Sequence, residues 1–187
     1  MIYCMSYVIT GNPGVGKHTI SKEISKILNL PIIDINQIAK ESDLLEKKEE
    51  THDVDVIKLS KLLQEKIIQP SIIVGHLAPY VLEPKKITKV LVFRKNPYDL
   101  IPIYKERNYS KEKIKDNLGS EVLGVIFYDS ISKFGQKKTI QLDVTNQSIE
   151  ESVKKSIDAV NEKIQPDDVD WLTIISEKKD LEQFFAY

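Results

Sequence analysis

A glycine-rich stretch near the N-terminus carries the clearest chemical signal in the sequence. Residues 11–19 read GNPGVGKHT, in which Gly11, Gly16 and Lys17 match the phosphate-binding pattern G-x-x-x-x-G-K-[ST]. Glycines of this kind let backbone N–H groups converge on phosphate oxygens, and the lysine brings a positive charge to the β and γ phosphates. His18 stands where the pattern has the Ser or Thr whose hydroxyl contacts magnesium. The stretch therefore predicts nucleotide binding with an altered metal contact.

Arginine, the side chain best suited to clamp a phosphoryl group, is scarce in this chain. Arg94 and Arg107 are the only arginines among 27 basic residues, and both lie within residues 92–117. A guanidinium can hold a phosphate through two parallel hydrogen bonds, whereas a surface arginine is simply solvated. Both interpretations stay open for each residue. The chain contains neither the N-K-x-D tetrapeptide of GTPases nor the LSGGQ signature of ABC-type ATPases. The short spacing from the loop to the next strand and the chain length favour a small kinase of the nucleoside monophosphate type.

Apolar runs of strand length alternate with helical patterns and indicate how these residues are positioned. A P-loop of this kind follows a strand and opens a helix. The alternation predicts a single α/β domain of the P-loop, nucleoside monophosphate kinase-like type, with a five-stranded parallel sheet and helices on both faces. The expected strands cover 3–10, 31–34, 71–75, 89–93 and 139–143, and the expected helices 17–29, 56–67, 110–134 and 148–160, the last of them starting with a capping box at Ser148 and Glu151.

The composition narrows the class of protein further. The chain has 187 residues, of which 41% are hydrophobic, and a net charge of −1, which gives no global electrostatic case for nucleic acid or an anionic membrane. No apolar run approaches the roughly 18 residues that span a bilayer, so we expect a cytoplasmic protein without a membrane partner. The single cysteine, Cys4, excludes an intramolecular disulfide, and we expect its side chain to be buried.

Two stretches are poor in core residues. Residues 41–55 are highly charged, and we expect a mobile surface segment there that includes His52 as a surface residue. Residues 165–187 follow the last predicted helix and are expected to form an appended tail or a short helix. We expect Trp171 to anchor this tail by packing.

Several segments resemble the atypical adenylate kinases of archaea and of the eukaryotic nucleus, which also act as NTPases in small-subunit ribosome maturation. The resemblance covers about residues 6–172 and is most specific from Arg107 to Glu121, which is similar to the short lid that this family places over ATP. The segments that carry it are GNPGVGKHT, PIIDINQIAKE, IIVGHL, VLVFRKNP, ERNYSKEKIKDNLGSEV and VDW.

The resemblance implies a kinase domain over 1–172, with a monophosphate-binding arm at about 34–56 and a lid at about 106–116, followed by a tail at 173–187. It implies an ATP site formed by Gly11, Gly14, Val15, Gly16, Lys17, His18, Thr19, Arg107, Thr145 and Asn146. It implies an AMP site at Asp34 and Arg94, catalysis by Lys17, Arg107 and His76, and a weak magnesium contact at Asp34, through water. Asp34 could instead cap the following helix, and His76 could be an ordinary loop histidine.

The chain departs from the family pattern at four positions. His18 replaces the P-loop hydroxyl, and Val74 replaces an acidic residue two positions before His76. Asn108 replaces the lid glycine, although Asn tolerates a left-handed backbone better than most residues, and Ile103 stands where the family often has arginine. Because two of these changes remove magnesium-linked groups, we expect nucleotide binding to be preserved and turnover to be modest.

The resemblance implies a phosphotransferase, an adenylate kinase that uses Mg²⁺ and converts ATP and AMP into two ADP, with a slow ATPase activity beside it. The alternative is a nucleotide-dependent assembly factor of the small ribosomal subunit, which would bind a small-subunit ribosomal protein and show little kinase turnover. A third interpretation is a nucleotide-binding protein without turnover. Nothing in the sequence indicates direct contact with nucleic acid.

Overall fold

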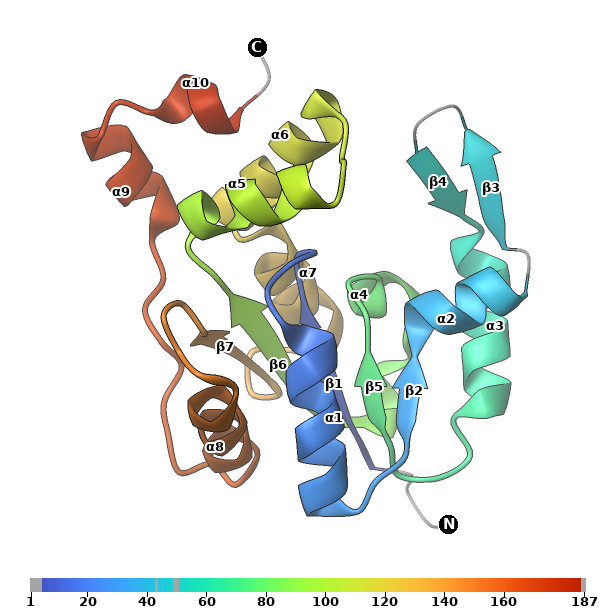
Figure 1. The fold of residues 1–187 in the computed structure, drawn as a ribbon. Helices are drawn as coiled ribbons and strands as arrows, with labels where there is room; N and C mark the ends of the chain where they lie inside the picture. Colours follow the sequence, from blue (N-terminus) through green and yellow to red (C-terminus); the bar gives the residue numbers. More distant parts are fainter. Residues whose placement is uncertain (1–4, 43, 49–50, 186–187) are drawn as a thin grey trace.

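The computed structural model describes residues 5–42, 44–48 and 51–185. At its centre lies a five-stranded sheet in the order β2-β5-β1-β6-β7, in which every neighbouring pair is parallel (Figure 1). The strands are β1 Ser6–Gly11, β2 Ile32–Asp34, β5 Ile72–Val74, β6 Ile87–Arg94 and β7 Thr139–Asp143. The predicted five-stranded parallel sheet is therefore confirmed.

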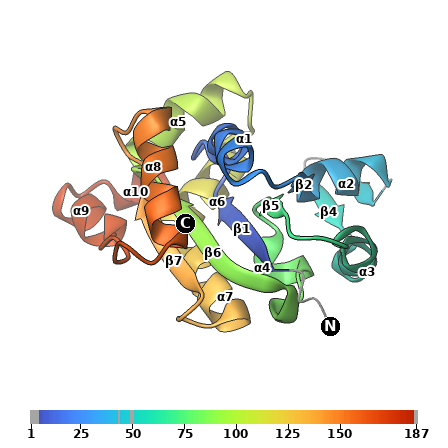
Figure 2. The same ribbon diagram turned by 90° about the horizontal axis from the view of Figure 1, so that it is seen from below.

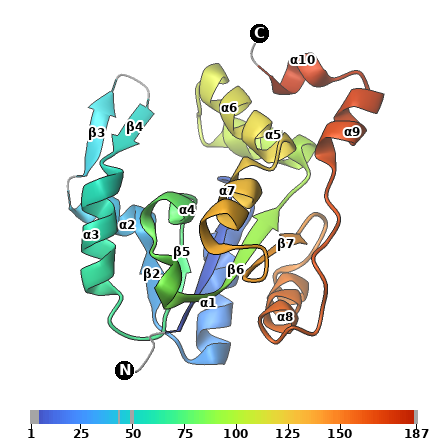
Figure 3. The same ribbon diagram turned by 180° about the vertical axis from the view of Figure 1, so that it is seen from behind.

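Helices cover both faces of this sheet, as Figures 2 and 3 show. One face packs against α1 Lys17–Leu28, α5 Pro97–Glu106 and α8 Ile149–Val160, and the other against α4 Ala78–Val81 and α7 Val125–Phe134. Successive strand residues therefore serve two different cores: in β1, Val8 belongs to one apolar cluster and Ile9 to the other, and neither is exposed. Strands buried on both faces read as continuous apolar runs, which is why β1, β5, β6 and β7 could be predicted, whereas the partly exposed β2 was predicted from the short run PIID.

The prediction of a single long helix over 110–134 is wrong, because two helices occupy this stretch. Helix α6 spans Lys111–Val122 and α7 begins at Val125, and between them Gly124 adopts a left-handed backbone with φ 65°. A Cβ atom on Gly124 would lie 3.1 Å from Nη1 of Arg94. The side chains on both sides keep helical spacing, so the apolar pattern did not reveal the break, which falls at a glycine with a left-handed backbone.

The charged stretch expected to be a mobile surface segment contains a hairpin. Strands β3 Leu45–Lys48 and β4 Thr51–Val54 pair in an antiparallel manner, between α2 Ile35–Glu41 and α3 Val56–Lys66. Figure 1 shows the hairpin extending from these two helices, away from the sheet. The charged composition gave no apolar alternation from which strands could be predicted. The structure does not describe the side chain of His52 or residue Cys4, so the expectations for both lie outside the described residues.

The C-terminal stretch folds into two short helices that join the core. These are α9 Trp171–Glu177 and α10 Leu181–Phe184, which lie beside α5 and α6 in Figure 3. Trp171, Ile175 and Phe184 are buried in the same apolar cluster as Ile9 of β1. The predicted end of the kinase domain at 172 thus falls inside a helix that packs with that domain, and Trp171 occupies the packing position expected of it.

Candidate active site

The P-loop connects the end of β1 to the start of α1, so the expected strand-loop-helix context is present. Gly14 and Gly16 both have φ 88°, a conformation that favours glycine. Gly16 is the N-cap residue of α1, so the backbone N–H groups of the first helical turn face the loop. A helix start with this geometry binds anions through its free N–H groups and its partial positive charge.

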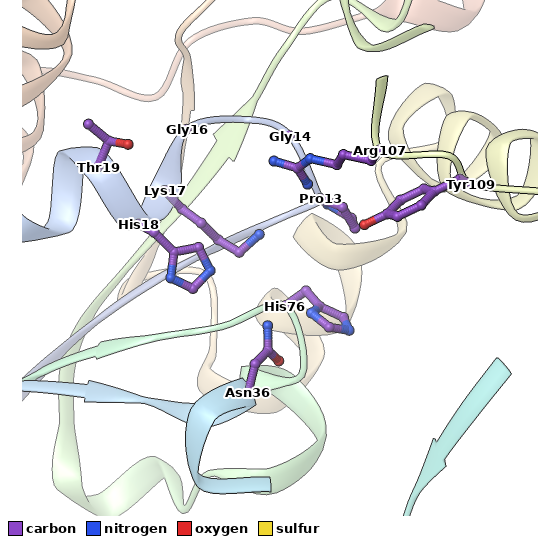
Figure 4. Close-up of a pocket in the computed structure, with 10 residues that line it drawn as sticks. All are labelled: Pro13, Gly14, Gly16, Lys17, His18, Thr19, Asn36, His76, Arg107 and Tyr109. Atoms are coloured by element: carbon purple, nitrogen blue, oxygen red, sulfur yellow. The ribbon is translucent and has the colours of Figure 1, made fainter. Parts of the chain in front are cut away.

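A cavity of about 200 Å³ opens on this loop (Figure 4). It gathers groups from the P-loop, the start of α1, the start of α2, the end of β5 and the lid. The lining residues are Pro13, Gly14, Gly16, Lys17, His18, Thr19, Asn36, His76, Arg107 and Tyr109. Three segments far apart in sequence therefore bring Lys17, His76 and Arg107 to one cavity, as the catalytic prediction requires. Sequence reasoning missed Asn36 and Tyr109, although both lie within the segments that carried the family resemblance.

Lys17 is the buried cation of this cavity, with 4% of its surface exposed. Its Nζ donates a hydrogen bond of 3.1 Å to the backbone carbonyl of Asn12. Burial, followed by the nearby charge of Arg107, lowers the pKa of Lys17 to about 8, while Asp34 and Glu121 oppose that shift. The ammonium group is therefore still mostly protonated at neutral pH, and it can bind a phosphate oxygen there.

His18 is held by an acidic residue of the neighbouring strand. Its Nδ1 lies 3.0 Å from Oδ2 of Asp34. The other oxygen of Asp34 accepts the backbone N–H groups of Asn36 and Gln37, so Asp34 is also the N-cap of α2. Burial opposes ionisation of Asp34, but the hydrogen bonds from His18 and from these two amides hold its pKa below the ordinary value. The capping alternative for Asp34 thus holds, and the same carboxylate also faces the P-loop.

His76 follows β5 at the edge of the sheet where ligands of parallel sheets collect. Burial, together with the positive charges of Lys17, His18 and Lys113, lowers the pKa of His76 to about 4. The imidazole is therefore neutral at physiological pH. A neutral imidazole can donate one hydrogen bond and accept another, which suits a group that orients water or a phosphate oxygen.

Arg107 lies at the C-terminal end of α5, and its side chain extends into the cavity (Figure 4). The next residue, Asn108, has φ 54°, which is the left-handed backbone expected where the family has glycine. Tyr109 stacks on Tyr104 with ring centroids 5.6 Å apart, and the Tyr104 hydroxyl donates a 2.7 Å hydrogen bond to the Pro13 carbonyl. This stack connects the beginning of the lid to the P-loop.

Arg94 lies outside this cavity. Only 3% of its surface is exposed, and its guanidinium donates to Oε1 and the backbone carbonyl of Glu121 and to Oε1 of Gln141, at 2.8, 2.6 and 2.9 Å. The alternative of a solvated surface charge is therefore wrong for this residue. The geometry gives Arg94 a structural position, and its contact with AMP stays a prediction.

A second cavity of about 160 Å³ adjoins the other side of the P-loop. The predicted adenine contacts, Thr145 and Asn146, are not among its lining residues, whereas Val144 and Gln147 on either side of them are. Thr145 instead accepts the backbone N–H of Asn96 at 2.8 Å. The remaining lining residues are Gly14, Val15, Gly16, Thr19, Ile20, Lys95, Ser148, Ile149 and Ser152.

Asp34 is the only carboxylate of the described residues that both hydrogen-bonds a lining residue of the first cavity and lies beside the P-loop. Within the parts of the chain that the structure describes, no group of three or more His, Cys, Asp or Glu side chains could hold a metal ion. Magnesium commonly binds to proteins through one or two carboxylates and the phosphates of a substrate. The residues present fit a magnesium ion that arrives with a nucleotide, and they do not fit a site built from protein ligands alone.

Comparison with known proteins identifies the family. The family model of the AAA domain matches residues 8–124. A putative adenylate kinase of Methanocaldococcus jannaschii is 33% identical over 173 residues, which cover 89% of this chain and 93% of that protein. One from Saccharolobus solfataricus is 31% identical over 154 residues, or 81% of each chain. This chain belongs to the adenylate kinase-like family of P-loop proteins.

The fold of this adenylate kinase-like protein also has counterparts among known structures. Shikimate kinases from Aquifex aeolicus and Bacteroides thetaiotaomicron superimpose with TM-scores of 0.54 and 0.55 at 17% identity. Each comparison covers 84% of this chain, and 97% and 98% of the two kinases. At this identity the likeness concerns the fold alone. Among the described residues, no helix is both long and apolar enough to cross a membrane.

Restoring the P-loop hydroxyl in this adenylate kinase-like protein should change its use of magnesium. We expect His18→Thr to tighten the apparent affinity for Mg²⁺ in the presence of ATP, because Mg²⁺ prefers oxygen ligands and the substitution releases Asp34 from His18. Metal-free ATP binding should be nearly unchanged, because the glycine backbone and Lys17 are retained. Titration with Mg²⁺ at fixed ATP measures the effect.

The matched control for this experiment is His18→Ala. It also releases Asp34, but it adds no hydroxyl, so its Mg²⁺ affinity should stay below that of His18→Thr. If His18→Thr abolishes activity, the imidazole has a positive catalytic role and is more than a tolerated departure.

Proposed function

We propose that the protein is an adenylate kinase, which transfers the γ-phosphoryl group of ATP to AMP and forms two ADP. The observation that supports this most strongly is the cavity into which Lys17 of the P-loop and Arg107 of the lid both extend. Phosphoryl transfer is catalysed mainly by positioning and by cations placed around the transferring group. The names of the relatives in the archaea agree with this choice of reaction.

In this mechanism the P-loop backbone and Lys17 bind the β and γ phosphates of ATP. Arg107 enters from the lid and stabilises the negative charge that spreads over the γ-phosphoryl group during transfer. AMP occupies the side of the cavity formed by Asn36 and the α2 end of the monophosphate-binding arm. Neutral His76 orients a phosphate oxygen or a bound water. Magnesium, when bound, would neutralise phosphate charge, with Asp34 as the nearby carboxylate acting through water.

The test is an assay that separates two products. With ATP and AMP present, we expect formation of ADP at a rate far above the release of inorganic phosphate from ATP alone. The physical reason is that Arg107 lies where it can stabilise transfer to a bound acceptor, whereas hydrolysis requires water to enter the same closed site. Coupled detection of ADP, and separate detection of phosphate without AMP, give the two rates.

The opposite pattern would contradict the proposal. Phosphate release that is independent of AMP, with no AMP-dependent ADP, would favour the nucleotide-dependent assembly factor. Within this alternative, a ribosomal protein as partner rests on the family resemblance alone. ATP binding without either product would leave a nucleotide-binding protein without turnover, the third interpretation, in which the changes at His18 and Val74 have removed more than part of the activity.

A further inference from the structure

A fully buried carboxylate lies behind the P-loop, outside the cavity that binds substrate. Glu121, near the C-terminal end of α6, has 0% of its surface exposed. Burying a charge is costly unless it is paired and hydrogen-bonded. Arg94 supplies the opposite charge, with Nε 2.8 Å from Oε1 of Glu121. A core that keeps such a pair where apolar residues would pack indicates a role beyond filling space.

The same carboxylate connects three further parts of the fold. Oε1 also accepts the indole N–H of Trp171 at 3.2 Å and the backbone N–H of Lys95 at 3.2 Å. Oε2 accepts the side-chain amide of Asn12 at 2.7 Å. Helix α6, helix α9 and the end of β6 are thereby fixed to one P-loop side chain.

Asn12 transmits this arrangement to the phosphate-binding lysine. Its side chain, 3% exposed, is held by Glu121, and its backbone carbonyl accepts the hydrogen bond from Nζ of Lys17. A chain of contacts therefore runs from Glu121 through Asn12 to Lys17. Among the described residues, Glu121 is the one hydrogen-bond partner of the Asn12 side chain.

We propose that Glu121 is a positioning residue for phosphoryl transfer, which acts through Asn12 to hold the P-loop and to orient Lys17. This inference deepens the proposed kinase function and rests on it for its kinetic part. Neither Glu121 nor Asn12 lines the cavity that Lys17, His76 and Arg107 share. Their effect must therefore reach the substrate through the lysine.

The decisive variant is Asn12→Ala, which removes the link and leaves the buried pair of Arg94 and Glu121 intact. We expect kcat to fall by about 10- to 100-fold, since a displacement on the order of 1 Å in a catalytic group can cost about 10²-fold, together with a smaller loss of ATP affinity. The matched control is Trp171→Phe. It removes a different hydrogen bond to Glu121 and keeps an aromatic ring in place, so it should lower thermal stability without changing kcat.

A second variant, Glu121→Gln, tests the charge separately from the contact. The charged groups that act on Lys17 are Arg107, Asp34 and Glu121, and the negative charge of Glu121 raises the pKa of the lysine. Removing that charge should move the alkaline loss of ATP affinity to lower pH. Asn12→Ala keeps the charge, so in that variant the alkaline limb should stay where it is in the wild type.

Three measurements distinguish a positioning role of Glu121 from a purely structural one: isothermal titration with ATP across pH, steady-state kinetics and thermal melting. A purely structural role would lower the melting temperature of all three variants and leave kcat, ATP affinity and the alkaline limb at their wild-type values, which would overturn the proposal. If Glu121→Gln fails to fold, Asn12→Ala alone decides. If the wild type shows no kinase activity, the proposed function fails. The positioning role is then tested by ATP affinity: weaker binding in Asn12→Ala supports it, and wild-type binding refutes it.

Discussion

Replacing Lys17 with alanine is expected to remove most of the ATP affinity and essentially all of the phosphoryl transfer. The side chain is the buried cation of the P-loop cavity, and in the proposed mechanism its charge meets the β and γ phosphates. A hydrogen bond to a charged group is worth about 1.5–3 kcal/mol, which corresponds to roughly 10- to 100-fold in affinity. Titration calorimetry with ATP and the coupled ADP assay measure the two losses.

The pH dependence of ATP binding gives the same prediction a second readout. The pKa of Lys17 in the free protein is about 8, so the lysine is protonated below that pH. Above that pH the lysine is mostly neutral and must take up a proton before it can pair with a phosphate. The affinity for ATP therefore falls as the pH rises. The Lys17→Ala variant should lack this alkaline limb.

Lys26→Ala is the matched control, because Lys26 is an exposed lysine on the same helix that pairs with Glu23. It should behave like the wild type in affinity, rate and pH dependence. Unchanged ATP affinity and rate in Lys17→Ala would remove the assignment of residues 11–19 as a phosphate-binding loop.

Replacing Arg107 with alanine should lower kcat strongly while leaving the binding of AMP nearly intact. In the proposed mechanism its contact with the phosphoryl group strengthens as charge develops during transfer, so its loss should lower kcat and barely change the KM for AMP. An arginine in this role can be worth roughly 10³-fold in rate. Steady-state kinetics with varied AMP and ATP measure both constants.

Lys105→Ala provides the comparison for Arg107, because Lys105 is an exposed cation two residues earlier on α5 and does not line the cavity. It should keep wild-type kinetics. A wild-type kcat in Arg107→Ala would return this arginine to the group of solvated surface charges, and the search for the cation that meets the phosphoryl group would turn to Lys113, which lies 4.4 Å from the ring of Tyr109.

The parts of the fold that could be predicted are those with local signals. The strands of the parallel sheet are apolar runs, the capping box at Ser148 and Glu151 is present as expected, and the P-loop pattern lies within nine residues. The charged strands β3 and β4 have no such signal. The break at Gly124 leaves the apolar spacing on both sides unchanged, and the closeness of Arg94 to this glycine is a tertiary contact that no local pattern records.

Burial of Arg94 was missed for the same reason. Its partner, Glu121, lies 27 residues further along the chain, and a single arginine after a strand looks the same whether it faces solvent or a buried carboxylate. The pairing of His18 with Asp34 likewise joins the first turn of α1 to the end of β2. Tertiary contacts set these positions, so the partners of these residues could not be predicted from local sequence patterns.

The place of β1 in the middle of the sheet has a consequence for the order of assembly. Tyr7 of this first strand pairs with Ile72, and Val8 pairs with Val90, so during synthesis β1 has both edges unpaired until much of the chain has been made. Pairing between such distant segments slows folding, and open strand edges favour association with other chains. The indole of Trp171 reaches the P-loop network later still. ATP, which binds only the finished loop, should therefore draw refolding chains toward the native state.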